Sequence, residues 1–179
     1  DAAESAARRA ARLNPGLAIA HHALATALQC QGKLEEALAA YHRAIQLKPD
    51  YADAQYLLGN ALMEAGQLQE AEASLRRALK LRPGFFEALS DLGAVLLMTG
   101  QTAAASVALD QALALRPDSP EVLANLANLL EMDERVEDAL ALYQRALQAR
   151  PDSLDVLAKQ AELLEKAGRM EAAQQALDQ

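Results

Sequence analysis

The sequence predicts an all-α fold built from stacked pairs of helices. Five prolines, at Pro15, Pro49, Pro83, Pro117 and Pro151, follow one another at intervals of 34 residues, and a strict period of this length is typical of helix-pair repeats. Aromatic residues make up only 3% of the chain, so the apolar half consists mainly of Ala and Leu, both strong helix formers. Repeats this short bury their apolar faces only against neighbouring repeats. We therefore expect one continuous array.

The prolines divide the chain into four complete repeats with a partial repeat at each end. The complete repeats are residues 18–51, 52–85, 86–119 and 120–153; residues 1–17 would supply only the second helix of a repeat, and residues 154–179 a last partial repeat. On this reading residues 1–179 form a single repeat array, with two helices in each complete repeat.

The first helix of each repeat is predicted from apolar residues spaced i, i+3, i+4 and i+7, such as Leu89, Leu92, Gly93 and Leu96. A glycine that can adopt a left-handed conformation ends this helix in four repeats, at Gly32, Gly66, Gly100 and Gly168. The repeat 120–153 has Glu134 at this position instead. We expect weaker local stability there.

The second helix of each repeat also places its apolar residues on one side, as Ala71, Leu75, Ala78 and Leu79 do in residues 52–85. The proline that follows ends it. Acceptors just after the prolines are expected to cap the next first helix, namely Asp50, Asp118 with Ser119, and Asp152 with Ser153. Pro120 fits a first helical turn.

The residues directly before the prolines are cations, namely Lys48, Arg82, Arg116 and Arg150. A cation is favoured at a helix C-terminus by the helix dipole, so we expect a structural role for them rather than a phosphate-binding stripe.

Composition and charge exclude several classes of protein. A net charge of −8 argues against general nucleic-acid binding. The longest apolar run, Leu92 to Met98, is too short to cross a membrane. The single cysteine, Cys30, is expected to be a buried and unreactive thiol. The compartment is left open, with the cytoplasm favoured over the periplasm.

The sequence contains no pattern that indicates catalysis. The adjacent His21 and His22 point about 100° apart on a helix, which is poor geometry for a metal, and no third ligand is evident. No carboxylate pair stands beside a nucleophile or a glycine-rich phosphate loop. We therefore expect no catalytic residues, no metal site and no cofactor.

The order of small residues, glycine, alanine and proline in each repeat closely resembles the tetratricopeptide repeat (TPR) family over the whole chain. Two columns carry the likeness in register with the prolines: Ala25, Gly59, Gly93, Ala127 and Ala161 in the first helices, and Ala37, Ala71, Ala105, Ala139 and Ala173 in the second. The resemblance implies a right-handed superhelical solenoid of antiparallel helix pairs, with the first helices lining a concave surface where ligands bind. The chain departs from the family where Gln160 replaces a leucine and where the usual aromatic residue becomes His21, Gln55, Leu89, Leu123 or Leu157.

The resemblance also predicts which residues line the ligand-binding groove: His22, Thr26, Tyr56, Asn60, Met63, Glu64, Asp91, Asn125, Asn128, Glu131, Lys159 and Glu162. Gln29 and Lys166 are also expected to face inward. Asn60, Asn125 and Asn128 could each donate to a peptide carbonyl and accept from a peptide N–H. This placement has a distant likeness to the asparagine-lined grooves of protein O-linked glycosyltransferases. The excess of acids favours neutral or basic segments.

These residues predict a protein–protein interaction scaffold that holds a peptide or partner segment. The alternative is a substrate-recruiting or assembly region of a larger enzyme, such as a glycosyltransferase, or of a secretion apparatus. The two-carboxylate clamp of chaperone-binding relatives is not expected, because the matching positions hold His22, Thr26, Leu57, Glu87 and Asp91. Homo-oligomers through end-to-end stacking of residues 1–14 or 171–179 are a third possibility.

Overall fold

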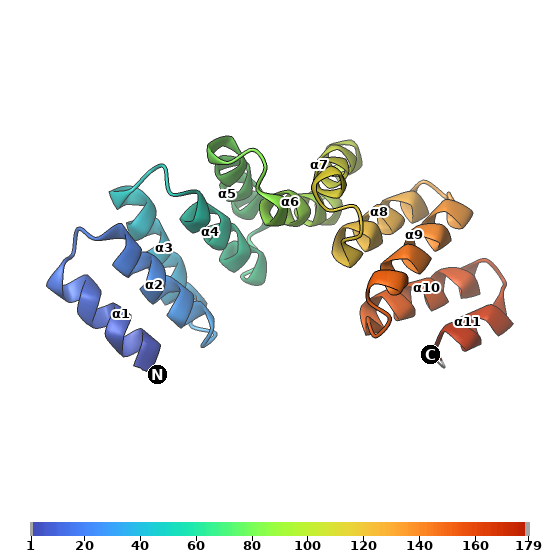
Figure 1. The fold of residues 1–179 in the computed structure, drawn as a ribbon, viewed down its shortest axis with the longest axis horizontal. Helices are drawn as coiled ribbons and strands as arrows, with labels where there is room; N and C mark the ends of the chain where they lie inside the picture. Colours follow the sequence, from blue (N-terminus) through green and yellow to red (C-terminus); the bar gives the residue numbers. More distant parts are fainter. Residues whose placement is uncertain (1, 178–179) are drawn as a thin grey trace. The chain divides into compact units, whose positions relative to one another are not determined.

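The structure is a computed structural model that describes residues 2–177 and contains α-helices and no strand within them. The helices are α1 (Ala2–Leu13), α2 (Ala18–Gln29), α3 (Leu34–Leu47), α4 (Ala52–Glu64), α5 (Leu68–Leu81), α6 (Phe86–Met98), α7 (Thr102–Leu115), α8 (Pro120–Met132), α9 (Val136–Ala149), α10 (Leu154–Lys166) and α11 (Met170–Leu177). Short turns join them into antiparallel pairs such as α2–α3, α4–α5 and α8–α9 (Figure 1). The predicted all-α class is confirmed.

The helices gather into two compact units, which we describe separately: unit 1 spans residues 1–95 and unit 2 residues 96–179. In unit 1, α2 packs against α1, α3 and α4, and in unit 2, α10 packs against α9 and α11. First helices begin at Ala18, Ala52, Phe86, Pro120 and Leu154. The repeat boundaries and the superhelical handedness stay predictions.

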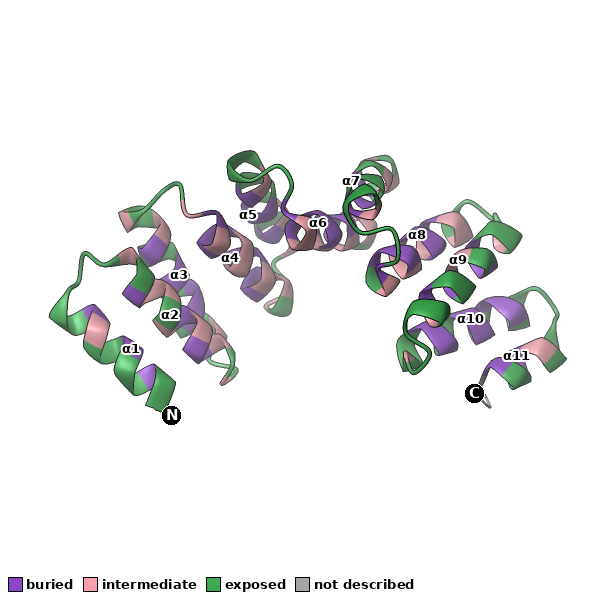
Figure 2. Cartoon of the chain, viewed as in Figure 1, coloured by how far each residue is buried: buried purple, intermediate pink, exposed green. Residues whose placement is uncertain are grey.

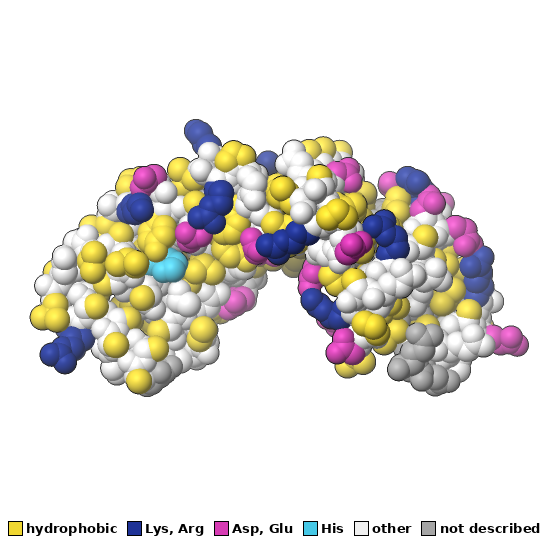
Figure 3. Space-filling model, in the orientation of Figure 1, with side chains coloured by type: hydrophobic (Ala, Val, Ile, Leu, Met, Phe, Trp, Pro, Cys, Tyr) yellow, Lys and Arg dark blue, Asp and Glu magenta, His cyan; other side chains and the backbone are white. Residues whose placement is uncertain are grey.

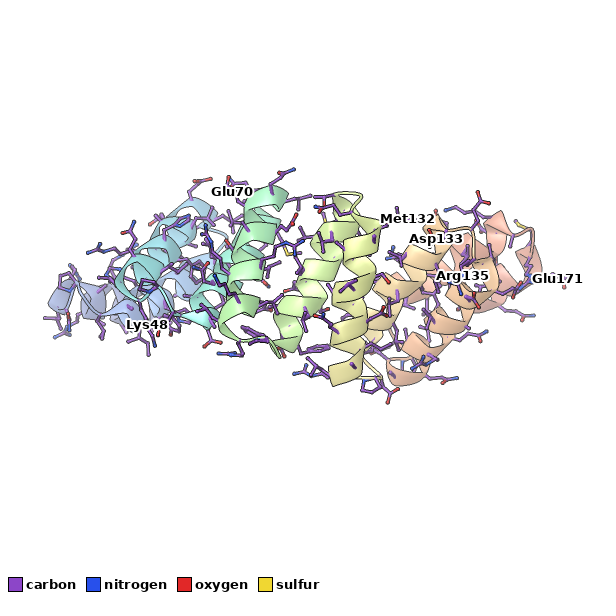
Figure 4. All side chains as sticks on the ribbon, turned by 90° about the horizontal axis from the view of Figure 1, so that it is seen from above. Lys48, Glu70, Met132, Asp133, Arg135 and Glu171 are labelled. Carbon is purple, nitrogen blue, oxygen red and sulfur yellow. The ribbon has the colours of Figure 1, made fainter. Side chains whose placement is uncertain are left out.

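Four of the turns between paired helices contain glycine in the left-handed conformation, as predicted. Gly32, Gly66, Gly100 and Gly168 have φ between 72° and 75°. Glu134 occupies the same turn of the repeat 120–153 with φ 58°, between Asp133 and Arg135, which are labelled in Figure 4. A side chain strains the backbone in this region, so the lower stability expected of this turn has a structural cause and stays a prediction.

Buried alanines mark the contact between paired helices. Ala37, Ala71, Ala105 and Ala139 are 0% exposed, and the buried residues of each helix lie on the sides that face its neighbours (Figure 2). Helices approach closely where side chains are small.

The fit between paired helices differs from one repeat to the next. A Cβ atom added to Gly59 would lie 2.8 Å from Cγ of Leu75, so glycine makes room for leucine in the repeat 52–85. The corresponding residues are Ala25 with Tyr41 in the repeat 18–51 and Ala127 with Tyr143 in the repeat 120–153, and both tyrosines are 0% exposed.

The helix caps differ partly from expectation. The Ser119 hydroxyl accepts from the Val122 N–H at 3.4 Å, and Pro120 follows in the first turn, as predicted. Ser153 precedes α10 but its side chain makes no capping bond, and α4 follows Tyr51, so the expected caps at Asp50 and Ser153 are wrong. Asp50 lies one residue too far from the first helical turn to act as the N-cap.

Two of the cations before the prolines, Arg82 and Arg150, bind carboxylates of their own repeat. Arg82 pairs with Asp53 at 3.0 Å, and Arg150 pairs with Glu121 at 2.6 Å. Each pair joins the end of a second helix to the start of the first helix of the same repeat. No helix within residues 2–177 is both long enough and apolar enough to cross a membrane.

Candidate ligand-binding faces

The predicted groove residues lie on two faces, one in each unit. Face 1 consists of His22, Thr26, Gln29, Tyr56, Asn60, Met63, Glu64 and Asp91, from α2, α4 and α6. Face 2 consists of Asn125, Asn128, Glu131, Lys159, Glu162 and Lys166, from α8 and α10. Within each face, hydrogen bonds bring most of these side chains together.

A chain of hydrogen bonds crosses face 1 from α2 to α4. The hydroxyls of Thr26 and Tyr41 lie 3.3 Å apart, and the Tyr41 hydroxyl donates to Oε1 of Gln29 at 2.9 Å. Nε2 of Gln29 then donates to Oε1 of Glu64 at 2.7 Å. Tyr41 belongs to the second helix α3, so the side chains of face 1 are bonded to the helix that packs against α2 as well as to one another.

A second cluster on face 1 joins α4 to α6. Nδ2 of Asn60 donates to the Tyr56 hydroxyl at 3.3 Å and to Oδ2 of Asp91 at 3.1 Å. Burial and, to a smaller extent, the nearby Glu87 carboxylate raise the pKa of Asp91 to about 6, against a hydrogen bond from Tyr56 that lowers it. Burial also raises the pKa of Tyr56, so its hydroxyl stays protonated. Oδ1 of Asn60 is buried without a hydrogen-bond partner, and Met63 is half-buried on the same helix.

His22 belongs to an aromatic cluster at the start of face 1. Its ring stacks on Tyr51 with centroids 4.9 Å apart and meets the edge of Tyr41 at 6.1 Å. Burial lowers the pKa of His22, which favours the neutral ring. His21 instead contacts the Pro15 carbonyl oxygen at 3.0 Å through Nε2. Within residues 2–177 no group of His, Cys, Asp and Glu is arranged to hold a metal ion.

Asn128 is the centre of face 2. Its Oδ1 accepts from the Tyr143 hydroxyl at 2.6 Å and from Nζ of Lys159 at 3.0 Å. A hollow of about 240 Å³ lies beside it, between α8 and the start of α10. Asn125, Asn128 and Lys159 line this hollow together with the apolar side chains of Ala124 and Val156. Three predicted groove residues therefore share one concavity.

The carboxylates of face 2 are paired with a lysine. Nζ of Lys166 lies 2.9 Å from Oε1 of Glu131 and 2.9 Å from Oε1 of Glu162. The two carboxylates raise the pKa of Lys166, and Lys166 lowers the pKa of Glu162. More generally, acidic and basic side chains are interspersed on the surface shown in Figure 3.

The structure changes the predicted role of two asparagines. Asn60 uses both amide hydrogens within the protein, whereas Asn128 uses both lone pairs of its oxygen. Asn128 therefore retains only its amide hydrogens for a peptide backbone, and Asn60 retains only an oxygen that is buried. Sequence reasoning missed Tyr41 and Tyr143, which follow Thr26 and Asn128 by 15 residues in both repeats, a recurrence that the period could have revealed.

Cys30 is exposed, and the expectation of a buried thiol is wrong. It lies at the end of α2, one residue past the last helical turn. The corresponding residues Glu64, Met98, Met132 and Lys166 are exposed too, because this end of each first helix extends beyond the packed core.

Paired helices at a fixed period, with polar clusters on the first helices, define a helix-pair repeat protein. Family models described as TPR repeat and Tetratricopeptide repeat match residues 27–66, and residues 62–129 and 130–179, respectively. The chain therefore belongs to the tetratricopeptide repeat family, whose members are protein-interaction scaffolds.

Solved structures agree with this assignment. MamA from Desulfovibrio magneticus RS-1 is similar with a TM-score of 0.80 and 24% identity, covering 90% of this chain and 91% of its own. YrrB, described as a TPR protein with an unusual peptide-binding site, has a TM-score of 0.78 and 25% identity over 98% of this chain and 91% of its own. PilF from Pseudomonas aeruginosa has a TM-score of 0.81 and 24% identity over 95% of this chain and 78% of its own. No curated protein sequence matches the chain.

Proposed function

We propose that the protein is a non-catalytic scaffold whose face 1 binds a basic or neutral peptide segment of a partner protein. The observation that carries this proposal is the way in which Glu64 and Asp91 are held. Gln29 and Asn60, both uncharged, donate to these carboxylates. The negative charge of the exposed Glu64 is therefore available to a lysine or arginine of a ligand, and the half-buried Asp91 adds to the negative potential of the face.

The side chains of face 1 are fixed before a ligand arrives. The bonds from Tyr41 through Gln29 to Glu64 hold the Glu64 carboxylate in place, and the stack of His22 on Tyr51 holds an aromatic surface at the start of the face. Preformed positions reduce the entropy that binding costs on the scaffold side. YrrB, whose description includes a peptide-binding site, supports a peptide as the ligand class.

Face 2 has a different contribution in this proposal. Because Oδ1 of Asn128 is already occupied, its amide hydrogens are the groups that remain for a peptide carbonyl. The adjacent hollow of about 240 Å³ suits a small side chain of the bound segment. Glu131 and Glu162 contribute less charge selectivity than Glu64, because both of them are paired with the ammonium group of Lys166.

Calorimetry with two short peptides tests the charge preference, one alternating Lys with Ser and the other alternating Glu with Ser. We expect the basic peptide to bind more tightly, and its affinity to fall as salt rises. Glu64→Gln should weaken binding of the basic peptide by about three- to tenfold, since one charged hydrogen bond is lost. Stability should change little, because Glu64 is exposed.

Arg43→Ala is the control, because Arg43 is exposed on α3 and, among residues 2–177, its one side-chain hydrogen bond goes to Gln46 of the same helix, at 3.4 Å. Arg145 is less suitable, because it donates to the Pro117 carbonyl at 3.2 Å. Tighter binding of the acidic peptide would contradict the proposal. So would loss of binding in Arg43→Ala together with full binding in Glu64→Gln.

A second candidate function is an assembly or substrate-recruiting region of a larger enzyme or secretion apparatus. Face 2 favours it over a purely basic-peptide reader, since Asn125 and Asn128 sit side by side at one hollow as they would in an asparagine-lined groove. Asn125→Ala should then weaken binding of neutral Ser-rich and Thr-rich peptides while leaving the basic peptide unaffected. Calorimetry with both peptides measures the difference.

A further inference from the structure

A cavity of about 460 Å³ lies in unit 2 among α9, α10 and α11. Its apolar lining includes Leu140, Leu164 and Ala176, and its polar lining includes Gln144, Gln160 and Arg169. This volume falls within the range of known small-ligand pockets, about 300–1,000 Å³. The neighbouring helices α9 and α10, and α10 and α11, pack directly against each other (Figure 1).

Gln160 is the unusual residue of this cavity. It is only 8% exposed, yet its side-chain amide makes no hydrogen bond within the described part of the chain. The corresponding residues of the other repeats are all leucines, Leu24, Leu58, Leu92 and Leu126. Although the residue is largely buried, the nitrogen and oxygen of its amide are not fully enclosed by protein, so they are open to a ligand in the cavity that the residue lines.

The cavity is separate from face 2. Gln160 and Leu164 lie four residues apart and therefore on the same side of α10. Lys159 and Glu162 of face 2 are turned away from Gln160 by about 100° and 200° around the helix axis. A ligand in the cavity therefore contacts α9 and α11, whereas a ligand on face 2 contacts α8.

We propose that this cavity binds a short extended peptide segment that carries a leucine-like side chain. The Gln160 amide offers one donor and one acceptor, which match the C=O and N–H of an extended backbone, whereas a helix would have used both internally. Leu140 and Leu164 supply the apolar surface for the side chain.

The rim indicates that the segment is uncharged at this point. Arg169 donates to both carboxylate oxygens of Glu137, so each satisfies the other's charge. A charged ligand side chain would have to break this pair, while a neutral one leaves it intact.

The probe for the test is N-acetyl-leucine N-methylamide, compared with N-acetyl-glycine N-methylamide, in an NMR titration of the 179-residue chain. We expect saturable shifts of the Leu140, Leu164 and Ala176 signals with the leucine compound and weaker binding of the glycine compound. Gln160→Leu should reduce the affinity about tenfold or more, because two hydrogen bonds are lost. The variant should fold, since leucine is the residue of the other repeats.

Gln148→Leu is the control, because it makes the same substitution at an exposed residue of α9 that does not line the cavity. It should leave binding unchanged. Absence of saturable shifts overturns the proposal, and so does equal binding by the parent and Gln160→Leu. Shifts at Asn125 and Lys159 in place of the cavity signals would also overturn it, because the probe would then occupy face 2.

Discussion

The two candidate ligand-binding faces make the same contact between successive first helices, with opposite charge. On face 1, Asn60 contacts Asp91, 31 residues later, and on face 2, Asn128 contacts Lys159, also 31 residues later. The asparagine donates to the acid in unit 1 and accepts from the lysine in unit 2. The residue opposite the asparagine, Asp91 in unit 1 and Lys159 in unit 2, therefore sets the charge at this contact and the direction of its hydrogen bond.

A second contact repeats this reversal. Gln29 and Glu64 are 35 residues apart, as are Glu131 and Lys166. The acid is the later residue in unit 1 and the earlier one in unit 2, so unit 1 presents a carboxylate where unit 2 presents an ammonium group. The repeat period sets which positions meet, and the residues at those positions set what the face can bind.

The largest expected effect tests whether the two units share the packing beneath these faces. Ala71→Leu in unit 1 and Ala139→Leu in unit 2 should each destabilise the protein by about 1–3 kcal/mol, because both alanines are fully buried between paired helices. Ala3→Leu should cost less, since Ala3 is exposed. Urea denaturation measures all three. Equal losses at the three sites would show that the assumed register is wrong.

The next prediction compares the stability of variants at two equivalent positions, Asp91 in unit 1 and Lys159 in unit 2. Asp91→Asn should stabilise the protein by about 1–2 kcal/mol at pH 7.5, because the ionised carboxylate is unfavourable where it is buried. Lys159→Gln should change stability by less than about 0.5 kcal/mol, because Lys159 is exposed. Denaturation midpoints of the two variants give the comparison, and an equal response would remove the contrast between the faces.

The gain in Asp91→Asn should also depend on pH. The pKa of Asp91 is raised from 3.8 to about 6 in the folded state, so this group favours folding fully below about pH 4 and loses that contribution as pH rises through 6. We therefore expect the difference between Asp91→Asn and the parent to shrink between pH 7.5 and pH 4.5. A constant difference across this range would mean that charge on Asp91 is not its cause.

The smallest effect concerns the turns. Glu134→Gly in unit 2 should stabilise the protein by about 1 kcal/mol, because glycine adopts positive φ without strain. Gly66→Ala in unit 1 should destabilise it by a similar amount, although a Cβ at Gly66 meets nothing within 4 Å. Thermal unfolding checks both. The two variants should change the stability in opposite directions. A loss of stability in Glu134→Gly would show that the Glu134 side chain stabilises the turn.

The sequence predicted the helices well because their start and end signals are local. Proline and glycine act within a few residues, so Gly32 and Pro120 could be placed without a structure. The hydrogen-bond partners on the faces could not be placed this way, since they join different helices. Cys30 was misjudged for the same reason, because burial at a helix end depends on how far the neighbouring helix extends. The groove positions of Asn125 and Asn128 were predicted, but not the hollow they share.

The match between Gly59 and Leu75, and between Ala25 and Tyr41, limits how the array can be rearranged by recombination. A first helix carrying Ala25 would clash with a second helix carrying Leu75 unless the leucine moved, because a Cβ at Gly59 already lies 2.8 Å from it. Conversely, a tyrosine opposite glycine would leave a void. Whole repeats therefore keep this match when they are exchanged, whereas a crossover at the turn between repeats with different pairs, such as 18–51 and 52–85, would break it.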